Sequence, residues 1–149
     1  MTTATHPAAA LVDSVLLEFD LDVERGKIRE FARATGATSA VYRGERAPIP
    51  PTFLISSMLW EPEDRPSLVD LLGLDLTRVL QGGQEFRFFG GVPHAGDRLY
   101  AVVSVESVTT KAGKRGGEMT FVVLLTRYRD PEGRVVAEAR ATVIERGRS

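Results

Sequence analysis

Apolar and polar residues alternate along much of this chain, the pattern of strands that bury one face. The alternating or extended stretches are residues 14–23, 79–92, 99–110, 119–129 and 134–146. Glycine pairs interrupt the second of them at Gly82-Gly83 and Gly90-Gly91, and glycine inside a strand is typical of a bulge or of close backbone approach. The turn Asp130-Pro131-Glu132-Gly133 joins the last two stretches and predicts a hairpin.

The period changes from two to that of a helix after Glu24. Ile28, Phe31 and Ala32 fall on one helical face with charged residues around them, and Gly36 follows where a C-terminal cap belongs. A second, shorter helix is predicted from the capping residue Ser67 to Leu72.

The most concentrated apolar run is Pro50–Trp60, which two prolines open. Proline suits the first turn of a helix, where a missing N–H costs little. We expect a helix that begins near Pro51 and is buried on nearly all sides over residues 53–59, with Met58 and Trp60 in the core. The strands would pack against this helix.

Helical segments followed by long strands predict an α+β fold, as one domain over residues 1–149 with a flexible start over residues 1–12. A curved antiparallel sheet wrapped around a central helix is the hot-dog arrangement. Because such a half-barrel leaves one sheet edge and one sheet face uncovered, we expect a dimer.

Composition excludes several classes of function. The formal net charge of −1 argues against nucleic-acid binding. The chain has no cysteine and two histidines, so a metal site is not expected, and no cofactor is indicated. No segment is apolar enough for a membrane span and the start does not read as a signal peptide, which favours a cytoplasmic protein.

Four short segments resemble the MaoC-like (R)-hydroxyacyl-thioester dehydratases, in the order in which that family has them. They are Gly26–Ala34, Ala47–Phe53, Gln84–Phe86 and Ala95–Leu99. The likeness is greatest to the N-terminal, substrate-holding half of that family, as in the non-catalytic subunits of mycobacterial-type (3R)-hydroxyacyl-ACP dehydratases.

The hydratase motif of that family, Gly-Asp-x-Asn-Pro-x-His, corresponds here to Gly36–Tyr42. Ala37 stands in the place of the aspartate and Tyr42 in the place of the histidine. Alanine transfers no proton, and tyrosine with a pKa near 10 is a poor base at neutral pH. The catalytic dyad is therefore absent from this chain, and whether the chain is an enzyme stays open.

The resemblance implies that the binding half of the site survives. The backbone N–H groups of Thr52 and Phe53, at the helix start, would hold the thioester carbonyl. Tyr42 and Arg43 would line the site entrance, where Arg43 could meet a carrier phosphate.

Other residues are weaker candidates for catalysis. Glu85 could act as a base from its strand, and His94 could titrate near neutral pH, although a strand carboxylate or a loop histidine is more often solvated. Lys111, Lys114 and Arg115 form a basic turn that more often faces solvent than docks a partner.

The resemblance leaves two functions open. The first is a non-catalytic subunit that binds an acyl-CoA or an acyl-carrier-protein thioester, as a homodimer or as a heterodimer with a catalytic hot-dog subunit. The second is a repurposed hot-dog enzyme of specialised polyketide biosynthesis, such as a cyclase. A thioesterase is a weaker third possibility, because no carboxylate is well placed in the helix region.

Overall fold

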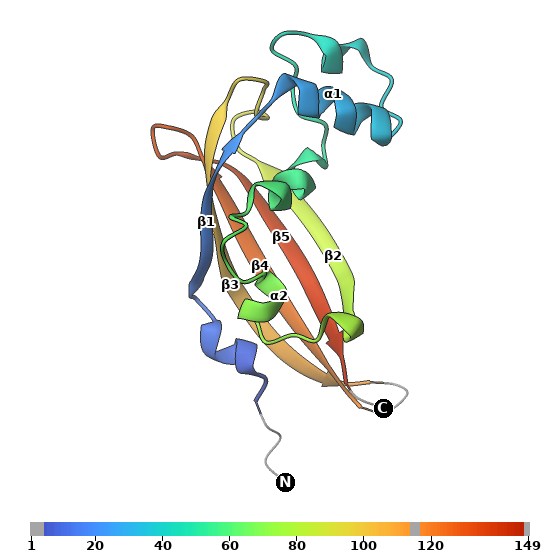
Figure 1. The fold of residues 1–149 in the computed structure, drawn as a ribbon, viewed down its shortest axis with the longest axis vertical. Coiled ribbons are helices and arrows are strands. Elements are labelled where there is room, and N and C mark those ends of the chain that lie inside the picture. The colour runs from blue at the N-terminus through green and yellow to red at the C-terminus, as the bar shows by residue number, and fades with distance from the viewer. Residues whose placement is uncertain (1–4, 114–116, 148–149) are drawn as a thin grey trace.

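The computed structural model describes residues 5–113 and 117–147, and its main element is one antiparallel sheet (Figure 1). The five strands occur in the spatial order β1-β3-β4-β5-β2, which leaves β1 and β2 at the two edges. Their bounds are β1 Val15–Asp22, β2 Val79–Phe88, β3 Arg98–Ala112, β4 Glu118–Arg129 and β5 Val135–Arg146. All four pairings are antiparallel.

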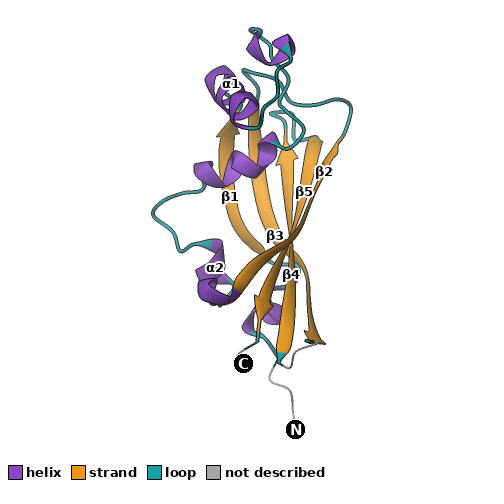
Figure 2. Ribbon diagram, turned by 90° about the vertical axis from the view of Figure 1, so that its right-hand side faces the viewer, coloured by secondary structure: helices purple, strands orange, loops and turns teal. Residues whose placement is uncertain are grey.

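Short helical segments lie before β1 and between β1 and β2. The α-helices are α1 Arg25–Ala34 and α2 Leu68–Leu71, and the 3₁₀ helices are η1 Pro7–Leu11, η2 Ala40–Arg43, η3 Phe53–Trp60 and η4 Leu76–Arg78. Figure 2 shows the η3 segment and α2 stacked along the same side of the sheet, with α1 at one end. The fold is therefore a sheet with helices on one face, the α+β arrangement that the sequence predicts.

The glycine pair in β2 produces the bulge expected from the sequence. The register of β2 against β5 shifts between Gln81 and Gly83. A Cβ atom on Gly82 would lie 2.6 Å from Ile144 Cδ1, so a larger residue would displace that side chain. Glycine at this position therefore leaves room for the Ile144 side chain of the neighbouring strand beside the bulge.

Local capping signals are also confirmed. Gly36 follows α1 with φ of +72°, and Gly73 follows α2 with φ of +64°, a region that glycine enters without steric cost. The Ser67 side chain accepts a hydrogen bond from the Asp70 N–H at the start of α2. Asp130 closes the β4–β5 hairpin, because its carboxylate accepts the Arg134 N–H at 2.9 Å.

The core lies between η3, the start of α1 and the upper half of the sheet. Ile28, Phe53 and Leu54 are fully or almost fully buried there, and they meet inward-facing residues of β1, β3, β4 and β5. The Phe31 and Phe53 rings contact each other edge to face at 5.5 Å between centroids. A second apolar cluster, which includes Leu72 and Val122, lies under α2.

The central segment differs from the sequence prediction. It is an eight-residue 3₁₀ helix whose buried residues are Phe53, Leu54 and Ser57. Phe53 and Leu54 are buried, whereas Met58 is 59% and Leu59 70% exposed. The expectation of burial on nearly all sides is wrong, and Trp60 is partly buried at the edge of the core.

Hydrogen bonds explain why this segment is not α-helical. Pro51 has no N–H to donate, and the Phe53 and Ile55 N–H groups donate to the carbonyls three residues back. The Ser56 hydroxyl donates to the Phe53 carbonyl at 2.7 Å, where it competes with the α-helical bond.

The expectation of a flexible start is wrong for residues 7–11. They form η1, and Ala8 is fully buried against the cluster under α2. Residues 1–4 lie outside the described part of the chain, as do Lys114 and Arg115 of the basic turn.

Candidate functional site

The segment that resembles the hydratase motif follows α1 directly and forms one wall of a cavity of about 380 Å³. Ala37 and Tyr42 both line this cavity, so the structure brings the two positions of the missing dyad together. Among the described residues, neither a carboxylate nor an imidazole lines it. The segment therefore offers no such proton-transfer group at this wall.

Short-range hydrogen bonds fix this segment against α1. The Ala37 N–H donates to the Ala32 carbonyl at 2.8 Å, which closes the end of the helix. The Ser39 hydroxyl accepts the Val41 N–H at the start of η2. The side chain of Tyr42 packs partly into the core, and the carbonyl of Arg43 accepts a hydrogen bond from the Arg25 guanidinium at 3.1 Å.

The start of η3 retains one of the two backbone donors that the resemblance implies. The Phe53 N–H donates to the Pro50 carbonyl at 3.0 Å, so it is not free to hold a thioester carbonyl, and the expectation for this residue is wrong. The Thr52 N–H has no hydrogen-bond partner within residues 5–113 and 117–147, and Thr52 is exposed. Of these two residues, Thr52 is therefore the one whose N–H could receive an incoming carbonyl.

Glu85 and His94 do not line the cavity that Ala37 and Tyr42 line. Glu85 lies on the edge strand β2, exposed, and pairs with Arg87 at 2.6 Å. His94 lies between β2 and β3, in a segment held by hydrogen bonds to Ala47 and Ile49 on its two sides. Its own N–H donates to the Asp97 carboxylate at 2.8 Å.

A buried polar cluster below η3 was not predicted from the sequence. Ser57 Oγ lies 2.8 Å from the Tyr128 hydroxyl, and both are buried. Burial, together with a smaller contribution from the nearby Glu61 carboxylate, raises the pKa of Tyr128 to about 12. Glu61 follows η3 directly, is half-buried, and has a pKa raised by desolvation. The alternation of β4 and the position of Ser57 four residues after Phe53 are the sequence signals for this contact.

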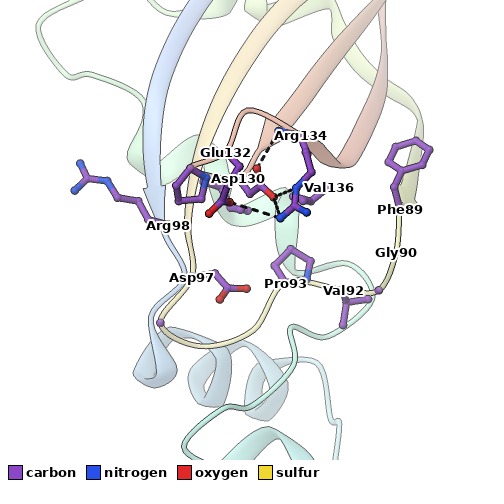
Figure 3. Close-up of a pocket in the computed structure, with 14 residues that line it drawn as sticks. Phe89, Gly90, Val92, Pro93, Asp97, Arg98, Asp130, Glu132, Arg134 and Val136 are labelled. Carbon is purple, nitrogen blue, oxygen red and sulfur yellow. Dashed lines mark hydrogen bonds and ion pairs between the residues drawn. The ribbon is translucent and has the colours of Figure 1, made fainter.

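A second cavity, of about 450 Å³, lies at the end of the sheet near the β4–β5 hairpin (Figure 3). Charged residues line it, but they are satisfied within the protein. Asp130 pairs with Arg134 at 2.8 Å, which helps to lower the pKa of this carboxyl. Arg98 pairs with Asp20 at 2.8 Å and Asp97 with Arg46 at 3.0 Å. This cavity therefore has little net charge to offer a ligand.

The part of the chain that the structure describes contains neither a metal site nor a membrane-spanning helix. No group of three or more histidine, aspartate or glutamate residues is arranged to hold a metal ion there. No described helix combines the length and the apolar character that crossing a membrane requires.

Solved structures define the class of protein to which this fold belongs, the hot-dog proteins of the MaoC-like dehydratase type. A MaoC-like dehydratase superposes with a TM-score of 0.75 at 20% identity, covering 93% of this chain and 43% of that one. The HadBC (3R-hydroxyacyl-ACP dehydratase) complex from Mycobacterium tuberculosis gives 0.61 at 24% identity, over 87% of this chain and 95% of that chain. The ChsH1–ChsH2 complex from the same organism gives 0.69 at 15% identity, over 95% and 88%. These likenesses confirm the predicted hot-dog fold.

Sequence comparison then places the chain within a family. Residues 12–139 match the family model described as the FAS1-like dehydratase domain region. A UPF0336 protein of Saccharopolyspora erythraea is 34% identical over 137 residues, which is 85% of this chain and 82% of the relative. The chain belongs to the FAS1-like dehydratase-domain family, together with the UPF0336 proteins.

Proposed function

We propose that this chain is the non-catalytic subunit of a 3-hydroxyacyl-thioester dehydratase, which binds an acyl thioester and pairs with a second hot-dog chain that carries the acid–base dyad. The observation that carries this proposal is the cavity wall at Ala37 and Tyr42. Both positions that correspond to the dyad lie on it, and neither side chain is the carboxylate or imidazole that the dyad requires.

The remaining site suits binding better than catalysis. The free N–H of Thr52 lies at the start of η3, where unpaired donors and the positive end of the helix dipole favour a carbonyl oxygen. The exposed apolar side chains of Met58 and Leu59 lie on the same segment. An acyl chain or a partner subunit would remove them from water.

Assembly with a second chain is part of the proposal. Both edge strands, β1 and β2, are free to pair, and Figure 2 shows one sheet face without a covering helix among the described residues. Solved relatives include two-component complexes, HadBC and ChsH1–ChsH2. A heterodimer would cover the open edge or face and supply the missing dyad.

The test is an enoyl-thioester hydration assay on the purified chain, alone and co-purified with a hot-dog chain that retains the Asp/His motif. We expect no activity above background from this chain alone and activity from the pair. The pair should lose activity when the histidine of the partner is replaced, whereas Tyr42→Phe in this chain should leave the rate within about twofold. Robust hydration by the homomer would contradict the proposal.

Glu61 favours a second candidate, a repurposed enzyme that catalyses a cyclisation or a related rearrangement. Its raised pKa brings this carboxyl closer to the range in which it exchanges protons at neutral pH, and the Ser57–Tyr128 pair lies nearby. If this candidate is correct, Glu61→Gln abolishes turnover by the homomer. If the subunit proposal is correct, Glu61→Gln leaves the activity of the pair unchanged.

A further inference from the structure

Three arginines line the cavity beside α1. Arg29 and Arg33 lie one turn apart on α1, and Arg43 ends η2. The rest of the wall is apolar or carries hydroxyl groups, from Thr38, Ser39 and Tyr42. The cavity volume of about 380 Å³ is large enough for part of a small-molecule ligand.

These three guanidinium groups make no ion pair within residues 5–113 and 117–147, unlike most of their counterparts. Arginines that do pair with a carboxylate are Arg46, Arg78, Arg87, Arg98, Arg127, Arg134 and Arg140. Glu30, the acidic residue of α1, pairs with Lys27 at 3.1 Å and not with an arginine. The cavity beside α1 is therefore positively charged, whereas the charges of the cavity in Figure 3 are internally paired.

The position of the arginines is set by the fold. Arg29 and Arg33 share a helix face because they are four residues apart. The Arg43 backbone is fixed by two contacts of η2: the Arg25 guanidinium donates to its carbonyl at 3.1 Å, and the neighbouring Tyr42 packs on the core. Like charges that line one cavity repel one another, and an anion in that cavity would relieve the repulsion.

We infer that this cavity binds a multiply charged phosphate group. Guanidinium groups present planar pairs of N–H donors that match phosphate oxygens, and the Thr38 and Ser39 hydroxyls can add further donors. A single carboxylate would balance one of the three positive charges. A phosphomonoester, with about two negative charges at neutral pH, or a diphosphate balances more of them.

This step rests on the proposed function. If the ligand is an acyl thioester, the phosphate group could come from coenzyme A or from the arm of a carrier protein. Coenzyme A carries a diphosphate and a 3′-phosphate, whereas the arm of a carrier protein carries a single phosphodiester. The charge of the cavity favours coenzyme A. It also favours free pyrophosphate over uncharged pantetheine, and this expectation does not depend on the acyl group.

The test is isothermal titration of the full chain with pyrophosphate, coenzyme A, pantetheine, and an acyl carrier protein in its holo and apo forms. We expect pyrophosphate and coenzyme A to bind, pantetheine to bind at least about tenfold more weakly, and affinity to fall as salt is added. Arg29→Ala, Arg33→Ala and Arg43→Ala should each weaken binding about three- to tenfold, and Arg33→Lys should weaken it less than Arg33→Ala. Tighter binding of the holo than of the apo carrier would assign the phosphate to the carrier.

Arg98→Ala is the matched control, because it removes an exposed arginine from the other cavity and should leave the affinity unchanged. Equal binding of pantetheine and coenzyme A, or an equal loss in Arg98→Ala and Arg33→Ala, would overturn the inference even if hydration by the subunit pair is observed. Arginine-dependent pyrophosphate binding with no hydration by any pair would support the phosphate site and contradict the proposed function instead.

Discussion

Ser57 Oγ lies 2.8 Å from the Tyr128 hydroxyl, and this contact joins residues 71 positions apart in the chain. It links η3 to β4 within the core, where the Tyr128 hydroxyl also lies 3.4 Å from the Leu54 carbonyl. Both side chains are shielded from water, so each satisfies a polar group that would otherwise be buried without a partner.

Removal of the Tyr128 hydroxyl should leave the buried Ser57 hydroxyl unsatisfied, whereas removal of the Ser57 hydroxyl leaves Tyr128 only its longer bond to the Leu54 carbonyl. We expect Tyr128→Phe and Ser57→Ala each to lower the free energy of unfolding by about 1–3 kcal/mol. The double variant should cost less than the sum, because the second substitution removes the orphaned group. Denaturant unfolding of the three variants measures this, with the exposed Tyr100→Phe as control. Additive effects would show that the two hydroxyls do not interact.

Stability should also fall at alkaline pH because of Tyr128. Its pKa is raised from 10.0 to about 12 by burial, so between these values the unfolded chain loses the proton and the folded chain keeps it. The stabilisation is fully present below pH 10 and is lost as the pH rises toward 12, by roughly 2–3 kcal/mol in all. Tyr128→Phe should flatten this part of the curve of unfolding free energy against pH. An unchanged slope in that variant would assign the loss to other groups.

Leu54 and Leu59 lie on the same 3₁₀ helix, but truncating them should change the stability by very different amounts. Leu54 is 1% exposed and Leu59 70% exposed, so we expect Leu54→Ala to cost about 2–5 kcal/mol and Leu59→Ala less than about 0.5 kcal/mol in the isolated chain. If Leu59 contacts a partner subunit, Leu59→Ser should weaken the complex in analytical ultracentrifugation without a change in melting temperature. A melting temperature that Leu54→Ala leaves unchanged would contradict the assigned core.

Glu145 should be the most sensitive charged residue of the chain. It is buried near the end of β5, where it accepts hydrogen bonds from Arg78 at 2.9 Å, from the Asp75 N–H at 2.7 Å and from His6 Nε2 at 3.0 Å. His6 Nδ1 already accepts the Ala8 N–H, so Nε2 is the ring nitrogen that carries the proton.

We expect Glu145→Ala to cost about 2–3 kcal/mol, because its loss leaves buried donors without an acceptor. Glu132→Ala, at an exposed carboxylate, is the control and should cost less than about 0.5 kcal/mol. Thermal and denaturant unfolding both measure the difference. Equal costs for the two substitutions would contradict the role of Glu145.

Local chemistry explains why the strands and turns could be predicted from the sequence. Alternation fixes which face of a strand is buried, and residues such as Gly36 and Ser67 act on their immediate neighbours. The central segment could not be predicted in the same way. Composition made Met58 resemble a core residue, but the 3₁₀ geometry set by hydrogen bonds at Pro50 and Ser56 turns it to the surface.

The candidate site was predictable only where a motif is continuous in sequence. Ala37 and Tyr42 lie in one short segment, and in the structure both line one cavity. The pairing of Ser57 with Tyr128, and of Glu145 with His6, depends on which helical segment packs against which strand. Such packing is a tertiary property that no local pattern along the chain encodes.

The position of β2 at the edge of the sheet has a consequence for the order of folding during synthesis. Its backbone pairs only with β5 within the described sheet. Val79 therefore cannot form its pair until Glu145, 66 residues later, has been synthesised. Until that segment leaves the ribosome, Phe86 and Phe88 have no neighbouring strand to hold them against the core. A nascent chain that stops before β5 would expose the unpaired edge of β2 together with Phe86 and Phe88, and it would be prone to chaperone binding and to aggregation.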